Sequence, residues 1–336
     1  MTRTTTVAFS KHSANLFFHI LTKCNLKCRH CYINPKQHGK NTLPLATITA
    51  WLNAFSQDSH SKNLIFLGGE PTLHPDLPAA VKYACKLGFG SITIDTNGYL
   101  FGDILDKVTP EELDYFSFSL DGATRQTNDR IRGKGSFDTC LAGIRKSIAK
   151  GFKNSLIYTV SNDNIHELEM LIPLLADLGI DRFYIQVIGL RGKSAKKSTS
   201  GEELQVSKSQ WLATVPKIAG MIAELGITVT YPKVFLRSDE KFECAGLVAE
   251  NFFVFPNGRV YRCPLCEDFP IHSLVIKDNQ LIPATKLNES DFFGLNIPEG
   301  CVMNKLIQPY NLSYDRFGAP KYKIACCLLK EEIYKG

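Results

Sequence analysis

The feature that most constrains the fold is a regular alternation of short apolar runs and amphipathic stretches over residues 16–225. Between the runs, apolar side chains recur at helical spacing, as in Ile48, Trp51, Leu52 and Phe55. About six βα repeats predict an α/β chain whose parallel sheet forms a partial (β/α)6 TIM-like barrel. The predicted strands are Leu16–Thr22, Asn63–Leu67, Ser91–Thr96, Tyr115–Leu120, Asn154–Val160 and Arg182–Ile188. The predicted helices follow Pro44 and span Leu77–Leu87, Phe137–Lys150, Leu168–Leu178 and Val206–Leu225.

Polar or glycine-rich segments follow most of these strands directly. They are the loop that begins near Cys24, Gly68–Pro71, Asn97-Gly98, Asp121-Gly122 and Gly189–Arg191. Loops at the carboxyl ends of parallel strands gather at one face of a barrel, where functional residues are found. We therefore expect these segments to share one site.

Composition fits an enzyme that stays inside the cell. The chain has 336 residues, of which 44% are hydrophobic and 21% are charged. No apolar stretch is long enough to span a membrane, and no signal-peptide cleavage site follows Leu16–Leu21. Eleven cysteines without an export signal favour a reducing cytoplasm and metal ligation over disulfides. The net charge of +6 is mild, and aromatic residues do not interleave with the basic ones, so no nucleic-acid partner is expected.

Three cysteines follow the first predicted strand with CX3CX2C spacing: Cys24, Cys28 and Cys31. A [4Fe–4S] cluster normally takes four cysteines, and the next cysteine is Cys85, so the spacing predicts a cluster with one open iron. The alternative is a zinc site completed by His30, but His30 lies between two of the ligands, where joint chelation is awkward.

The βα pattern stops near Leu236, which predicts a boundary between a barrel domain, 1–236, and an iron–sulfur domain, 237–336. The second part holds six cysteines: Cys244, Cys263, Cys266, Cys301, Cys326 and Cys327. The stretch between Cys244 and Cys263 alternates around Pro256-Asn257-Gly258, which predicts a hairpin.

Together these motifs resemble the radical S-adenosylmethionine (SAM) superfamily, and within it the branch with SPASM or twitch C-terminal extensions. The resemblance rests on Cys24–Tyr32, Gly68–Pro71, Thr96–Gly98, Ser119–Gly122 with Asn128–Gly133, and the CX13GX4C segment that ends at Cys263. It implies an enzyme that cleaves SAM reductively and uses the resulting 5′-deoxyadenosyl radical to abstract a substrate hydrogen.

The resemblance also implies a set of SAM-binding residues. Gly68 and Gly69 would let the backbone approach the methionine part of SAM, and Glu70 would accept from its amino group. Asn97 and Ser119 would contact the methionine carboxylate or the ribose, and Arg132 would face the carboxylate. Tyr32 would lie near the adenine or simply pack. No residue is predicted to be directly catalytic.

One auxiliary [4Fe–4S] cluster in a twitch-like domain is expected, because the dense CX2CX5CX3C block of a full SPASM domain is missing. The favoured ligands are Cys244, Cys263, Cys301 and Cys326, with Cys266 and Cys327 as rivals. The resemblance further implies a reductant such as flavodoxin or ferredoxin. It favours a peptide or protein substrate slightly over a small molecule. A non-catalytic iron–sulfur or zinc protein is the alternative from another functional class.

Overall fold

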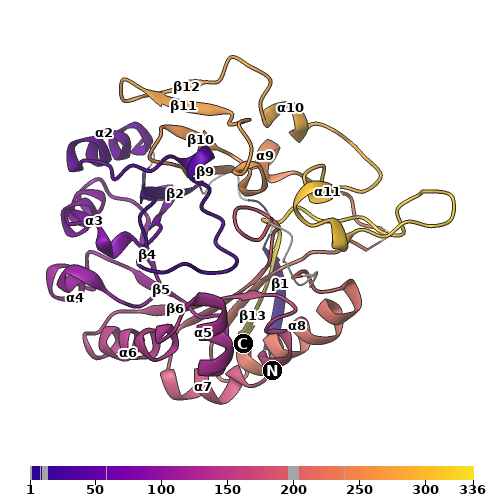
Figure 1. Ribbon diagram of the computed structural model, residues 1–336, viewed down its shortest axis with the longest axis horizontal. Helices are drawn as coiled ribbons and strands as arrows, with labels where there is room; N and C mark the ends of the chain where they lie inside the picture. The colour runs from indigo at the N-terminus through magenta and orange to yellow at the C-terminus, as the bar shows by residue number, and fades with distance from the viewer. Residues whose placement is uncertain (1, 8, 10–13, 58, 196–203, 238) are drawn as a thin grey trace.

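The computed structural model describes residues 2–7, 9, 14–57, 59–195, 204–237 and 239–336. Within these ranges thirteen strands form one sheet with the order β1-β13-β8-β7-β6-β5-β4-β3-β2-β9-β10-β11-β12. The strands from β2 to β8 run parallel in chain order and curve into a partial barrel, with helices on the outside (Figure 1). The predicted fold class is confirmed.

The predicted bounds of β4 and β6 match the structure, those of the other predicted strands differ by one or two residues, and one strand was missed. They are β2 (Ala14–Leu21), β3 (Lys62–Gly68), β4 (Ser91–Thr96), β5 (Tyr115–Ser119), β6 (Asn154–Val160), β7 (Arg182–Val187) and β8 (Thr228–Pro232). The missed strand, β8, is short and follows the last predicted helix. Its β-branched residues carry a strand signal, but its partners lie far away in the chain.

Helices cover the outer face of these strands. The longer ones are α2 (Leu45–Phe55), α3 (Leu77–Lys86), α5 (Arg125–Arg132), α6 (Ser136–Ala149), α7 (Leu171–Leu178) and α8 (Lys208–Ala223). The short ones are α1 (Pro35–His38), α4 (Ile104–Lys107), α9 (Ala245–Val248), α10 (Ser290–Phe293) and α11 (Asn304–Ile307). The predicted stripe of α2 is confirmed, since Ile48, Trp51, Leu52 and Phe55 are all buried.

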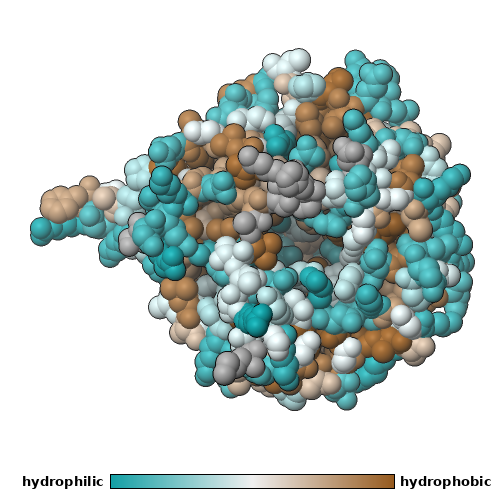
Figure 2. Space-filling model, turned by 180° about the vertical axis from the view of Figure 1, so that it is seen from behind, coloured by the Kyte–Doolittle hydropathy of each residue, from teal (hydrophilic) through white to brown (hydrophobic). Residues whose placement is uncertain are grey.

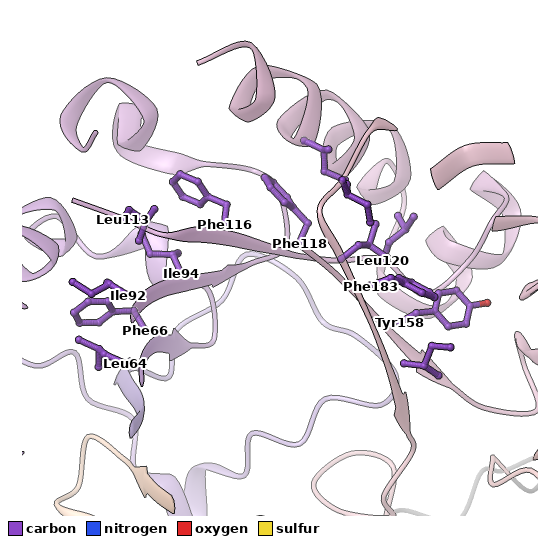
Figure 3. Packing of buried hydrophobic residues seen from close by; sticks show 14 of the residues in the cluster. Leu64, Phe66, Ile92, Ile94, Leu113, Phe116, Phe118, Leu120, Tyr158 and Phe183 are labelled. Carbon is purple, nitrogen blue, oxygen red and sulfur yellow. The ribbon is translucent and has the colours of Figure 1, made fainter. Parts of the chain in front are cut away.

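Alternation along the strands decides which side chains enter the core. Ile92 and Ile94 of β4 and Phe116 and Phe118 of β5 point toward the helices and pack in one apolar cluster (Figure 3). Their neighbours along the strands, such as Asp95 and Ser117, therefore face the opposite, inner side of the barrel. On β4 and β5, the inner face thus carries polar side chains.

The C-terminal part adds strands to both edges of the barrel. On one edge, β9 (Glu250–Val254) runs parallel to β2 and continues into β10 (Arg259–Tyr261), β11 (Leu274–Lys277) and β12 (Gln280–Pro283). The predicted hairpin joins β9 to β10. On the other edge, β13 (Lys330–Lys335) pairs with β8 and with β1 (Thr2–Val7). Residues 237–336 therefore share one sheet with the barrel.

Two further features belong to the outline of the molecule. Residues around the Tyr314–Pro320 bridge project as an arm, seen on the right of Figure 1 and on the left of Figure 2, where its tip is apolar. Phe317, at the turn, is 79% exposed. In the described ranges, no helix has the length and apolar character needed to cross a membrane.

Candidate functional site

The three N-terminal cysteines lie on the loop that leaves β2, and all three are partly exposed. Two contacts fix this loop: the Arg29 amide donates to the Ile131 carbonyl at 2.9 Å, and the Leu26 amide lies 3.3 Å from Cys24 Sγ. Burial is the main reason that the pKa of the Cys24 thiol is raised to about 11, and the nearby Cys28 and Cys31 thiols contribute to the rise. The thiols are thus close enough to influence one another, as the spacing predicts.

His30, which would complete the alternative zinc site, is engaged with another residue. In the described part of the chain, no three Cys, His, Asp or Glu side chains converge as ligands of a single metal ion. Ligands of one ion must meet at one point, whereas the cysteines of a [4Fe–4S] cube each bind a different iron. His30, the fourth ligand in the zinc alternative, instead places its Nε2 atom 3.2 Å from Asp121 Oδ2.

Gly68 and Gly69 lie where the end of β3 approaches the cysteine loop most closely. A Cβ atom at Gly69 would lie 2.3 Å from the Lys23 carbonyl oxygen, and one at Gly68 would lie 2.6 Å from the Leu21 carbonyl oxygen. The glycines thus let the end of β3 pack against the backbone that enters the cysteine loop. Hydrogen bonds reinforce this packing: the Gly69 amide donates to Leu21 and the Glu70 amide donates to Lys23.

Glu70 is buried, and its carboxylate is held by four donors of the chain itself. Oε1 accepts from the Thr72 amide, the Thr72 hydroxyl and the Thr96 hydroxyl, and Oε2 accepts from the Asn97 amide at 2.8 Å. Burial raises the pKa of Glu70, and these hydrogen bonds oppose the shift. Glu70 therefore ties the ends of β3 and β4 together, a contact that its motif alone does not predict.

Asn97 and Ser119 lie at the ends of β4 and β5, as predicted. The Asn97 amide group donates to Asn25 Oδ1 at 2.8 Å and lies 3.9 Å from Cys24 Sγ, so Asn97 supports the cysteine loop. The carbonyl of Ser119 lies 3.6 Å from the Cys140 thiol.

Arg132, the last residue of α5, is directed at Asp121, with its Nε atom 2.5 Å from Asp121 Oδ2. Burial by itself would raise the pKa of Asp121, but Arg132 and His30 hold it well below its usual range. Asp121 also accepts from the Thr159 amide at 2.8 Å. Asp121 is thus a buried anchor for both the cysteine loop and α5. Arg130, by contrast, bonds the Asp163 carbonyl at the surface.

Tyr32 is enclosed by neighbours from three parts of the chain. Its hydroxyl lies 2.7 Å from His19 Nε2, and the Arg191 guanidinium stands 4.9 Å from its ring centre. Both contacts belong to packing, which was one of the two roles expected for this residue.

A junction around Arg191 joins the cysteine loop to the C-terminal part, and it was missed by sequence reasoning. Arg191 forms a 2.6 Å ion pair with buried Glu267 and also bonds the Pro264 carbonyl. Asp268 accepts from the Asn34 side chain at 2.7 Å and from the Gly192 amide at 3.2 Å. The loop after β7 therefore contacts both the segment that follows the cysteine loop and the C-terminal part. Its ion pair spans 76 residues, so no local pattern reveals it.

The six C-terminal cysteines lie close together. Cys263, Cys266, Cys301 and Cys327 pack in one apolar cluster, and Cys326 packs in the adjoining one beside Ala245 and Ala249. The Cys326 thiol raises the pKa of Cys244, although burial is the larger cause. The structure therefore brings the four favoured ligands together. It places their rivals, Cys266 and Cys327, among them as well.

Comparison with known proteins agrees with the family resemblance. Residues 19–175 match the family model "Radical SAM superfamily". The chain is 33% identical over 189 residues to "Fe-coproporphyrin III synthase" of Methanosarcina barkeri, a match that covers 55% of this chain and 47% of that protein. It is also 33% identical over 184 residues to "Pre-heme d1 synthase" of Dinoroseobacter shibae, covering 54% and 45%. The chain thus spans about half the length of these curated relatives.

Solved structures show the same fold at low sequence identity. "Native anSMEcpe with bound AdoMet" matches with a TM-score of 0.63 and 13% identity, covering 87% of both chains. "Crystal structure of Streptococcus suis SuiB" matches with a TM-score of 0.62 and 14% identity, covering 84% of this chain and 64% of that one. The family match over residues 19–175 and the shared fold thus agree with the predicted resemblance to the radical SAM superfamily.

Proposed function

We propose that this chain cleaves SAM reductively at a [4Fe–4S] cluster held by Cys24, Cys28 and Cys31. The observation that carries the proposal is the set of three thiols on one loop above the ends of β3 and β4, with no fourth thiol beside them in the motif. When bound, such a cluster supplies the electron that splits SAM into methionine and a 5′-deoxyadenosyl radical, which abstracts a substrate hydrogen.

The residues around this loop bind and orient SAM in the proposal. The backbone at Gly68 and Gly69, together with Asn97, Ser119 and Tyr32, forms the SAM site. Glu70 acts as a positioning residue, because it holds the Asn97 amide. Arg132 would reach the SAM carboxylate only by sharing or leaving its contact with Asp121.

We further propose one auxiliary [4Fe–4S] cluster in 237–336, with ligands drawn from Cys244, Cys263, Cys301 and Cys326. Support comes from the apolar surroundings of these thiols, which exclude water, and from the Arg191 junction that links them to Tyr32. Cys266 and Cys327 remain the rival ligands. Flavodoxin or ferredoxin would deliver the electron, and the eleven cysteines fit a reducing cytoplasm.

For the substrate we favour a small organic molecule. The names of the curated relatives include a coproporphyrin synthase, a heme d1 precursor synthase and probable GTP cyclases, all of which act on small molecules. The solved structure with a bound precursor peptide is 14% identical and supports the fold alone. A peptide or protein substrate therefore stays a prediction.

The test is anaerobic reconstitution followed by reduction with dithionite in the presence of SAM. Wild-type protein should release 5′-deoxyadenosine, and the variant with Ala at Cys24, Cys28 and Cys31 should not. The same variant should retain about four irons if one auxiliary cube is present. Release at the wild-type rate by the triple variant would refute the proposal. Zinc in place of iron would favour the non-catalytic alternative.

A further inference from the structure

The arm around the Tyr314–Pro320 bridge is held in shape by hydrogen bonds of its own turn. The Asp315 amide donates to the Ala319 carbonyl at 2.8 Å, and Asp315 Oδ1 accepts from the Phe317 and Ala319 amides at 2.8 and 3.0 Å. Gly318, with a φ of 81°, closes the turn in a conformation that favours glycine. The turn presents Phe317, which is 79% exposed, and the end of the arm stands clear of the molecule (Figure 2).

The base of the arm is bonded to the segments that carry the C-terminal cysteines. The Cys301 amide donates to the Ile324 carbonyl at 3.3 Å, and the Ile324 amide donates to the Glu299 carbonyl at 2.9 Å. Ile324 in turn lies two residues before Cys326. A protein that docked against the base of the arm would therefore lie beside two of the favoured ligands of the auxiliary cluster.

A hollow of about 400 Å³ opens beside the base of the arm. Its apolar lining comes from Leu236, Pro298, Ala319 and Pro320. The hollow is large enough to take an apolar side chain of a partner, and the arm beside it ends in an exposed aromatic ring. Exposed apolar surface bordered by polar residues is typical of a protein–protein contact.

The unpaired charges of this surface are positive. Three exposed cations form no ion pair within the described ranges: Arg316, Lys321 and Lys323. Both lysines line the hollow, and the Arg316 guanidinium stands 4.7 Å from the centre of the Phe317 ring. The two carboxylates of the same region are engaged, because Glu299 pairs with Lys305 and Asp315 caps the turn. A second copy of the chain would bring the same cations to the contact, where they would repel, so the surface fits an acidic partner.

We propose that the arm and the hollow beside it form the docking surface for an acidic electron-carrier protein of the ferredoxin or flavodoxin class. The inference rests on the proposed function, in which such a carrier delivers the electron and the C-terminal cysteines hold a cluster. The cations attract the carrier, and Phe317 and the hollow supply the apolar contact. Complexes of electron carriers bury little surface, so one arm and one hollow are enough. The base of the arm then holds the carrier next to Cys301 and Cys326.

The experiment measures the binding of an oxidised ferredoxin and an oxidised flavodoxin to the reconstituted protein by calorimetry, so that no turnover is required. Cytochrome c, a small carrier with a basic surface, is the comparison probe and should not bind. Phe317→Ser should weaken the binding of the acidic carrier at least about ten-fold, as expected for the loss of an aromatic anchor. Lys321→Glu combined with Lys323→Glu should weaken it to a similar extent and reduce its dependence on salt.

Matched controls carry the same kinds of change elsewhere on the surface. Met170→Ser removes a side chain of the barrel that is 51% exposed, and Lys82→Glu reverses an exposed charge on α3. Both should bind the carrier with wild-type affinity. Iron content equal to that of wild type would show that the arm variants fold and load their clusters.

Several results would overturn the proposal. They are wild-type affinity in both arm variants, no binding of either acidic carrier by wild type, and a loss of affinity in Lys27→Glu alone, which would place the carrier at the cysteine loop. A wild-type dimer that Phe317→Ser dissociates, measured by light scattering, would assign the surface to a second copy instead. Failure of the proposed function would appear separately, as absence of 5′-deoxyadenosine from wild type reduced with dithionite.

Discussion

Replacing Gly69 with Ala should loosen the cysteine loop from the barrel. The added Cβ would lie 2.3 Å from the Lys23 carbonyl oxygen and 2.6 Å from that of Thr22, so backbone must move. Overpacking of this kind costs about 1–3 kcal/mol. The shift also strains the hydrogen bonds from the Gly69 and Glu70 amides, at about 1 kcal/mol each, for a total destabilisation of about 3–5 kcal/mol. Because Lys23 precedes Cys24, iron binding should weaken as well.

Urea unfolding and iron content after anaerobic reconstitution would measure both effects. The matched control is Gly220→Ala in α8, where a Cβ meets nothing within 4 Å. There, the better helix propensity of alanine should leave stability unchanged or raise it by up to about 1 kcal/mol. The reasoning is refuted if Gly69→Ala unfolds at the same urea concentration as wild type and binds the same amount of iron.

Three further predictions follow from the buried contacts of the site. Asp121→Asn should cost about 3–5 kcal/mol at pH 7, because it leaves buried Arg132 uncompensated. The difference in unfolding free energy between this variant and wild type should shrink as the pH falls below about 4, because a carboxylate with a lowered pKa stops stabilising the fold once it is protonated. A difference that does not change with pH would contradict this. Arg191→Lys should cost about 1–2 kcal/mol and hasten proteolysis of 237–336, because lysine cannot both stack on Tyr32 and hold Glu267. Arg145→Lys, at an exposed pair, is its control, and equal proteolysis of the two variants would count against the junction. Glu70→Gln should weaken SAM binding by about ten-fold, measured by equilibrium dialysis, and leave the iron content unchanged, because the new NH2 group would face the Asn97 amide donor. A loss of iron instead would mean that Glu70 supports the cluster.

Periodicity was enough to predict the barrel, because each strand from β2 to β7 carries its own apolar pattern and its own following helix. The edges of the sheet carry no such signal. Strand β1 is mostly exposed and reads Thr-Arg-Thr-Thr-Thr-Val, so nothing local marks it as a strand. It exists through pairing with β13, more than three hundred residues later, and β8 likewise depends on β13.

The location of the site could be predicted, but the partners of its side chains could not. Strand-end loops meet because parallel strands end at one face, so Cys24, Glu70 and Asn97 were placed together correctly. What each side chain touches depends on distances that the sequence does not encode locally. The hydrogen bonds that Thr72, Thr96 and Asn97 donate to Glu70, for example, could not be predicted from its motif.

The C-terminal part is continuous with the barrel in its packing, although its composition is distinct. Strand β2, which leads into the cysteine loop, lies between β3 and β9, and Phe17 of β2 stacks on Phe253 of β9 with ring centres 4.5 Å apart. From β9 the chain continues through the hairpin to Cys263. The strand that leads into the N-terminal cysteines is therefore bonded along its edge to β9, which leads through the hairpin to Cys263. The Arg191 junction adds a second connection, between Tyr32 and the segment from Pro264 to Asp268. Two separate connections, one through the sheet and one through side chains, therefore join the same two regions.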